Sequence, residues 1–166
     1  MKSITLKLVS IALFTAMLIS CSAEEDGIYS GELNAEDITL TYSPIEYEIV
    51  FLVNQHRESI GLSSLKTFNL VSREADGHTN YMLEVGELSH DNFGKRSTYL
   101  MDNANAIIVA ENVAYGFVTA EGVVNAWLKS EKHKATIENP TFTDFGISTE
   151  ANESGRNYFT NIFIKR

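Results

Sequence analysis

The segment IIVAENVAYG, residues 107–116, contains two polar side chains within an otherwise apolar run. Seven of its ten side chains are apolar or aromatic, a composition that favours a buried strand. Glu111 and Asn112 interrupt this run at its centre. A carboxylate in a protein interior is strongly unfavourable unless it is paired or protonated. The segment therefore predicts a strand that carries Glu111 to a polar partner.

Two helices are expected before this strand. SPIE, residues 43–46, places Ser at an N-cap, Pro in the first turn and Glu three residues after the cap, and Gly61 marks the end of the helix. A second helical pattern covers residues 69–85 and stops at Gly86. His78 falls on its apolar face, where a structural core histidine is the favoured interpretation.

A third helix is expected after the strand. Thr119 is suited to cap it, and Trp127 lies on its apolar face. Ser130 follows as the N-cap of a further short turn, which places His133 near the start of that turn. Residues 89–106, between the second helix and the strand, predict a loop with about one helical turn near residues 97–101.

The C-terminal part predicts a β-hairpin. β-forming residues at 145–149 and 158–164 flank EANESGRN, a tract rich in turn residues. With the strand around Glu111, they give an antiparallel sheet of at least three strands, which the helices cover on both faces. The expected fold class is α+β, a three-layer α-β-α sandwich with a central antiparallel sheet.

The N-terminus has the pattern of a secretory signal. Lys2 and Lys7 precede an apolar run of about a dozen residues that is too short to span a bilayer. LISC, residues 18–21, resembles a bacterial lipobox, which implies cleavage after residue 20 and acylation of Cys21. Cys21 is the only cysteine of the chain, so no internal disulfide is expected.

The segment after the lipobox is polar and acidic. Residues 21–42 are expected to form a flexible tether that carries the lipidated Cys21, with a short strand considered at residues 38–42. Its acidic residues loosely resemble surface-export tags of some Gram-negative lipoproteins. Residues 43–166 then form one domain of ordinary size. The expected location is the cell envelope, at the outer membrane or the cell surface.

The charge of the chain restricts its partners. The formal net charge is −9, and removal of residues 1–20 leaves 11 basic against 22 acidic side chains, a formal charge of −11. Nucleic acid and anionic lipid head groups would be repelled by such a surface. We therefore expect no nucleic-acid partner, and a membrane contact made by acyl chains rather than by a basic patch.

Histidine and carboxylate side chains are the candidates for chemistry. His56 lies at the polar end of the first helix, where a solvated position is favoured, whereas His90 and His133 lie beside helix ends. Glu111 is 21 residues after His90 and 22 before His133, a spacing that matches no metal signature. Spacing alone therefore does not join these three residues in one site.

Seven ordered blocks of the sequence resemble the CAP superfamily in its bacterial SCP-like form, over about residues 46–164. The family takes its name from cysteine-rich secretory proteins, antigen 5 and pathogenesis-related 1 proteins. The blocks are VNQHRESIGLSSL, ADGHTNYM, LSHDNFGKR, AENVAYG, AWLKSEKHKATIENP, FTDFGIS and YFTNIF. The resemblance implies a three-layer α-β-α fold and a central cleft with histidines and acidic residues at its floor.

Carried over by position, the resemblance implies a site formed by His90, Glu111 and His133. His90 would be the hydrogen-bond or charge partner of Glu111, and Asn112 would point the other way and bond backbone across the layers. Some family members bind a divalent metal in this cleft, and others bind sterols or fatty acids elsewhere. Zinc or another divalent cation is thus one expected cofactor. The chain departs from eukaryotic members at Ser130, where they carry a glutamate, and at Asn157, where a histidine might stand.

Three functional hypotheses remain open at this stage. The first is a binding module for a metal ion or for a small or lipid molecule, with His78, Asn112 and Ser130 supporting the ligating residues. The second is a hydrolase, in which His90 and Glu111 activate water, or Ser130 acts as a nucleophile with His133 as its base. The third is a surface adhesion or partner-binding protein, in which the polar residues only tie the layers together.

Overall fold

The structure is a computed structural model in which residues 40–166 are described. The expected signal peptide, the acylated Cys21 and most of the expected tether lie outside the described residues. Tyr42, at the end of that tether, packs on the domain, and its hydroxyl lies 2.8 Å from Ser72 Oγ. Within the described residues, no helix is both long and apolar enough to cross a bilayer.

Nine elements follow one another along the domain. They are α1 (Pro44–Ser59), β1 (Lys66–Thr67), α2 (Asn69–Val85), α3 (Phe93–Asn103), β2 (Ile108–Tyr115), α4 (Ala120–Lys129), α5 (Glu131–Ile137), β3 (Asp144–Ala151) and β4 (Asn157–Lys165). The strands form one sheet in the order β1-β3-β4-β2. β4 pairs antiparallel with both β2 and β3, whereas β1 pairs parallel with β3. β2 is therefore an edge strand, and it pairs only with β4.

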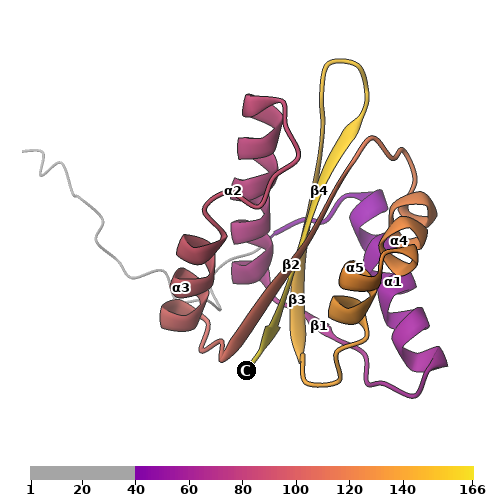
Figure 1. Ribbon diagram of the computed structural model, residues 1–166, viewed down its shortest axis with the longest axis vertical. Coiled ribbons are helices and arrows are strands. Elements are labelled where there is room, and N and C mark those ends of the chain that lie inside the picture. Colours follow the sequence, from indigo (N-terminus) through magenta and orange to yellow (C-terminus); the bar gives the residue numbers. More distant parts are fainter. Residues whose placement is uncertain (1–39) are drawn as a thin grey trace, which may run out of the picture. The chain divides into compact units, whose positions relative to one another are not determined.

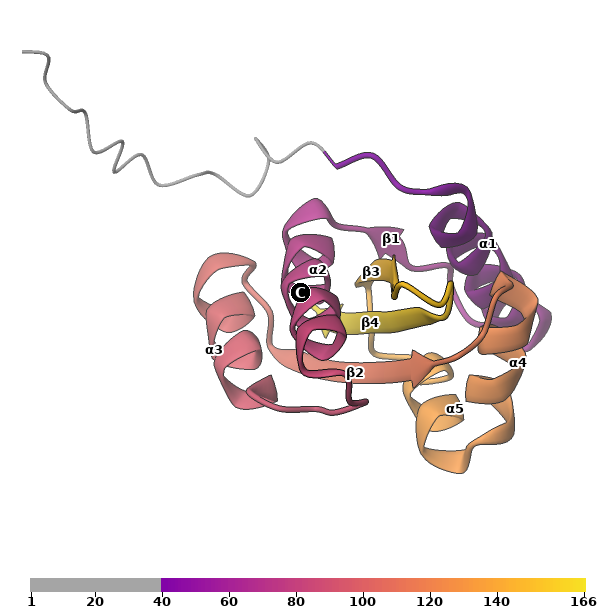
Figure 2. The same cartoon turned by 90° about the horizontal axis from the view of Figure 1, so that it is seen from above.

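The helices cover both faces of the sheet, as the α-β-α prediction requires. Figures 1 and 2 show α2 and α3 on one side of the sheet and α1, α4 and α5 on the other. One apolar cluster joins the α1–α4–α5 layer to the sheet around Trp127, Phe145, Phe159 and Phe163. A second cluster joins α2 and α3 to the sheet around Leu70, Val71, Leu100, Ile162 and Ile164.

The local start and stop signals of α1, α2 and α4 are confirmed. At the start of α1, the Ser43 backbone N–H donates to Glu46 Oε2 at 2.7 Å. The other Glu46 oxygen accepts from the Thr149 backbone N–H at 2.8 Å, which fastens this helix end to β3. α2 ends at Gly86 in a left-handed conformation, and the Thr119 side chain caps α4 by accepting from the Gly122 N–H.

Two expectations about secondary structure were wrong. The stretch after residue 89 contains an eleven-residue helix, α3, in place of a single turn. The expected antiparallel sheet of at least three strands is formed by β2, β4 and β3, and the two-residue strand β1 adds a parallel edge that makes the sheet mixed. Residues 40–42 of the strand considered at 38–42 are not in a strand, and residues 38 and 39 lie outside the described residues.

Helix α2 approaches the sheet closely at Gly146 of β3. A Cβ atom added there would lie 2.3 Å from the Ser72 backbone nitrogen and 2.4 Å from the Val71 carbonyl carbon. The helix backbone thus rests directly on the strand, and no flexible side chain can move aside. Gly77 in the same helix has open space at its Cβ position.

These two glycines predict opposite effects of the same substitution. Gly146→Ala should lower the free energy of unfolding by about 3 kcal/mol or more, because the helix must move off the strand. Gly77→Ala should raise it by about 0.5–1 kcal/mol, since alanine is the better helix former. Urea unfolding followed by circular dichroism measures both. A Gly146→Ala variant as stable as the wild type would contradict the close packing of α2 on β3.

Candidate functional site

Strand β2 sends its two central polar side chains to opposite faces of the sheet. Glu111 pairs in register with Ile162 and points to the α2–α3 face. Asn112 points to the other face, where its Nδ2 donates to the His133 carbonyl of α5 at 3.0 Å. The alternation of a strand therefore sends Glu111 to one layer and Asn112 to the other, as expected.

Glu111 is buried in an ion pair with Arg96 of α3. Its side chain is 1% exposed and that of Arg96 is 9% exposed. Arg96 Nη2 donates to both carboxylate oxygens, at 2.9 and 2.8 Å, and Nε donates to Oε2 at 3.0 Å. Two nitrogens of Arg96 thus contact the two carboxylate oxygens, and such forked, charge-assisted hydrogen bonds are the strong form of the arginine–carboxylate pair.

His90 is the second partner of Glu111, as the resemblance implied. Its Nδ1 lies 2.8 Å from Glu111 Oε1, and its side chain is 52% exposed. Because the carboxylate can only accept, His90 Nδ1 carries the proton of this bond. In the neutral ring the Nε2 lone pair is then free for another partner.

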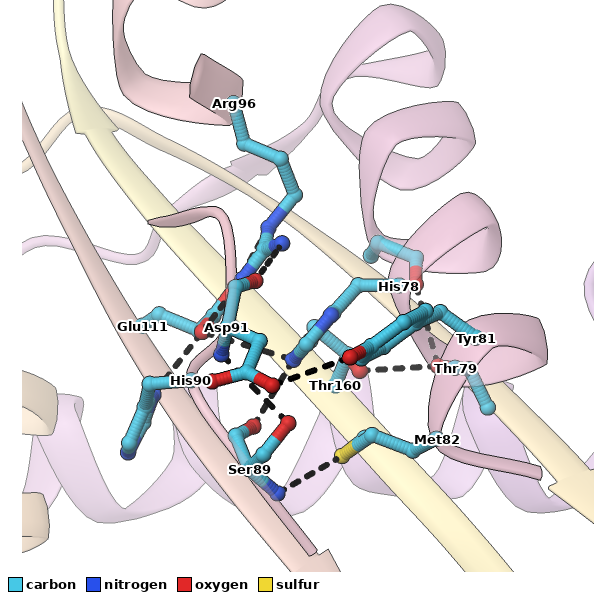
Figure 3. A network of polar contacts seen from close by, with 11 residues as sticks. His78, Thr79, Tyr81, Met82, Ser89, His90, Asp91, Arg96, Glu111 and Thr160 are labelled. Atoms are coloured by element: carbon cyan, nitrogen blue, oxygen red, sulfur yellow. Dashed lines mark hydrogen bonds and ion pairs between the residues drawn. The ribbon is translucent and has the colours of Figure 1, made fainter. Parts of the chain in front are cut away.

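The loop that carries His90 is joined to α3 through Arg96. Arg96 Nη1 donates to the Asp91 carbonyl at 2.6 Å, next to His90 in the chain. Asp91 also accepts a hydrogen bond from the Tyr81 hydroxyl of α2 at 2.9 Å. Figure 3 shows how these side chains converge from α2, α3, the loop and β2. His90 is thus positioned by groups from several elements.

His78 of α2 completes a polar cluster that we define as His78, His90, Arg96 and Glu111. Its side chain is fully buried, and its Nε2–H donates to the Ser89 carbonyl at 2.8 Å. The same nitrogen lies 3.8 Å from Glu111 Oε1, too far for a hydrogen bond. Among the described residues, nothing hydrogen-bonds to its buried Nδ1.

Burial lowers the pKa of His78 below its ordinary value. The nearby positive charge of Arg96 and the ring of His90 lower this pKa further, whereas the Ser89 carbonyl and Glu111 act in the opposite direction. His78 is therefore neutral at neutral pH. This agrees with the structural role expected from its place on the apolar face of α2.

His133 is not in direct contact with the polar cluster. It lies on α5, in the helical layer opposite Glu111, and burial lowers its pKa with a further contribution from the charge of His90. Ser130 holds the N-cap position of α5 as expected, but its side chain makes no capping hydrogen bond.

The other two residues weighed from the sequence have structural contacts. His56, expected to be solvated, is partly buried, and its Nε2 lies 2.8 Å from a carboxylate oxygen of Glu138, the C-cap of α5. Asn157, at a position where a histidine was considered, donates to the Phe117 carbonyl at 3.0 Å. Within the described residues, no hydrogen bond joins Ser130 to His133, so the proposed nucleophile–base pair is not assembled.

The polar cluster does not have the arrangement of a metal site. Within residues 40–166, no three His, Cys, Asp or Glu side chains are grouped so that they could hold a metal ion. In addition, both oxygens of Glu111 are already engaged, because they accept from Arg96 and His90. The set His90, Glu111 and His133 therefore does not fit the expected cation in this conformation.

Arg96 is the important residue that sequence reasoning missed. It belongs to the LSHDNFGKR block, six residues after His90, but a lysine-arginine pair next to glycine is usually a solvated surface. A signal was present in the conflict at Glu111, because a buried carboxylate beside one titratable histidine still lacks a permanent countercharge. The available arginines could have been searched for that countercharge.

Residues 50–163 match the family model described as CAP: Cysteine-rich secretory protein family. This match covers more than half of the chain, and the fold and the ordered blocks agree with it. The chain therefore belongs to the CAP family.

The chain is similar in sequence to a bacterial membrane protein and similar in fold to two bacterial proteins of known structure. The uncharacterized membrane protein YlbC of Bacillus subtilis is 30% identical over 96% of this chain, which spans 47% of that relative's length. An outer surface protein of Borrelia burgdorferi has a similar structure, with a TM-score of 0.68 and 20% identity, over 76% of this chain and 96% of that one. An extracellular SCP-domain protein of Bacillus anthracis gives a TM-score of 0.65 at 22% identity, over 77% and 45%.

Removal of the Glu111 charge should be costly. Glu111→Gln leaves the buried Arg96 guanidinium without its countercharge, and we expect a loss of about 3–5 kcal/mol in unfolding free energy. The matched control is Glu138→Gln, which removes the half-exposed partner of His56 and should cost about 0–1 kcal/mol. Urea unfolding of both variants tests this. Equal effects would show that the Glu111–Arg96 pair contributes no more than a surface pair.

The neutral state of His78 predicts a pH dependence of stability. The unfolded imidazole takes up a proton more readily than the folded one, since burial lowers the folded pKa. The contribution of His78 is therefore present above its unfolded pKa of about 6.5 and is lost as pH falls through the lower folded pKa. Between neutral and mildly acidic pH, the urea midpoint of His78→Gln should fall less than the urea midpoint of the wild type. If the urea midpoints of the two proteins fall equally with pH, the neutral His78 ring is not the source of the pH dependence.

Proposed function

We propose that this protein is an exported, lipid-anchored CAP-domain protein of the cell envelope that binds a small polar or lipid molecule at His90. Export and acylation are supported by the signal pattern and by the lipobox-like LISC ending at Cys21. The membrane and surface relatives are consistent with an envelope location. Binding at His90 is supported by the geometry of the polar cluster.

The proposal rests on a difference in exposure between the His90 ring and the Glu111–Arg96 ion pair that orients it. An ion pair that is almost fully buried holds a ring that is 52% exposed. Burying such a pair often stabilises a fold no more than apolar packing would. The exposed His90 ring itself contributes little packing. The arrangement is instead suited to present the imidazole edge, in one orientation, to a molecule outside.

A purely structural role explains less of the geometry. The Glu111–Arg96 pair alone would tie α3 to β2, and His78 already ties α2 to the Ser89 carbonyl. His90 is not needed for either connection. A hydrolase is supported less, because Ser130 and His133 are not hydrogen-bonded and the sequence has no GxSxG elbow.

Ligand binding can be tested on residues 22–166, which retain every described residue. Decanoate, palmitate and chitin-type oligosaccharides serve as probes, and the His90 ring signals are followed by NMR. We expect one probe class to shift these signals with a Kd below about 1 mM, a weak but specific affinity. The binding should be lost in His90→Ala.

His56→Ala is the matched control, because His56 also lies 2.8 Å from a carboxylate but on a different part of the surface. It should bind the probe like the wild type. Equal binding by His90→Ala would place the ligand elsewhere. If neither probe class shifts the His90 signals, the proposed ligand class is wrong.

A further inference from the structure

Three nitrogen-bearing groups converge on one oxygen atom, Glu111 Oε1. Arg96 Nη2 lies at 2.9 Å, His90 Nδ1 at 2.8 Å and His78 Nε2 at 3.8 Å. Two imidazoles and one carboxylate are a ligand set that zinc accepts in proteins. This set differs from the one expected from the sequence, because His78 takes the place of His133.

The Arg96 guanidinium is itself the cation that this carboxylate binds. It contacts both Glu111 oxygens and is itself 9% exposed. Its remaining Nη1 is held by the Asp91 carbonyl at 2.6 Å, so the group is bound at both ends. Arginine does not lose its proton in proteins, and the positive charge is therefore permanent.

In both His78 and His90, the nitrogen that faces Glu111 carries a proton, and a protonated nitrogen cannot bind a metal ion. His78 Nε2 uses its proton on the Ser89 carbonyl, and His90 Nδ1 uses its proton on Glu111. A metal bound by these nitrogens would need both rings to change tautomer. It would also add two positive charges beside Arg96.

We propose that Arg96 is a built-in replacement for a metal ion: it supplies the positive charge beside His78, His90 and Glu111 and excludes divalent metals from this cluster. The cluster thus differs from the metal-binding cleft that the family resemblance suggested. Arg96 also acts as a positioning residue, because it holds the carboxylate that orients the His90 ring. This inference goes beyond the proposed function and holds whether or not an organic ligand binds at His90.

The test compares zinc binding by the wild type and by Arg96→Gln, both as residues 22–166. The glutamine removes the charge and frees the Glu111 oxygens for a cation. We expect zinc to bind Arg96→Gln at least about tenfold more tightly than the wild type by calorimetry, the size of effect that neighbouring groups have on metal affinity. The gain should disappear in Arg96→Gln combined with His78→Asn or with His90→Ala.

Arg73→Gln is the matched control, because Arg73 is a cation of α2 whose Nη2 donates to the Tyr99 hydroxyl outside the polar cluster. It should bind zinc no better than the wild type. NMR of the histidine rings gives a second measurement: wild-type His90 should carry its proton on Nδ1, and zinc should move it to Nε2 in Arg96→Gln only.

Each outcome decides the proposal. If Arg96→Gln does not fold alone, recovery of its folded spectrum with zinc supports the proposal, and failure of zinc to restore it contradicts the proposal. Tight zinc binding by the wild type that is lost in His90→Ala and Glu111→Gln would overturn it. So would an Arg96→Gln variant that folds and binds zinc no better than the wild type.

Discussion

The buried Glu111–Arg96 ion pair is the interaction on which the polar cluster and its surroundings depend. A strand that is otherwise apolar brings a carboxylate into the interior, where it needs a permanent countercharge. Arg96 supplies that charge from α3 and uses its last donor on the Asp91 carbonyl. The position of α3, the course of the loop before it and the orientation of His90 follow from this one requirement.

The elements with local signals could be predicted from the sequence. The capping sequence at Ser43, Gly86 at the end of α2 and Thr119 before α4 each mark a helix end through backbone chemistry within a few residues. The hairpin was predictable in the same way, from β-forming runs on either side of a turn-rich tract. The layer order followed because these elements can bury their apolar faces in few ways.

The helix α3 and the strand β1 lack such signals. The buried face of α3 consists of Arg96 and Leu100, so the apolar repeat that indicates an amphipathic helix is missing. β1 is two residues long and exposed, and only its pairing with β3 defines it as a strand. For the site, the contact of Glu111 with His90 was predictable by resemblance. The contribution of Arg96 could be inferred only from the missing countercharge of Glu111, because an arginine on the inner face of a helix has no pattern of its own.

The composition of α3 also affects how the domain moves. An eleven-residue helix is marginal by itself, and this one is held to the sheet by an ion pair and few apolar side chains. Local opening of a protein begins where apolar contacts are few, so α3 is expected to detach more readily than α2, which buries more apolar side chains. When it does, Arg96 leaves Glu111 and the Asp91 carbonyl together, and the His90 loop loses its support. The lifetime of the oriented imidazole is then limited by the lifetime of one short helix.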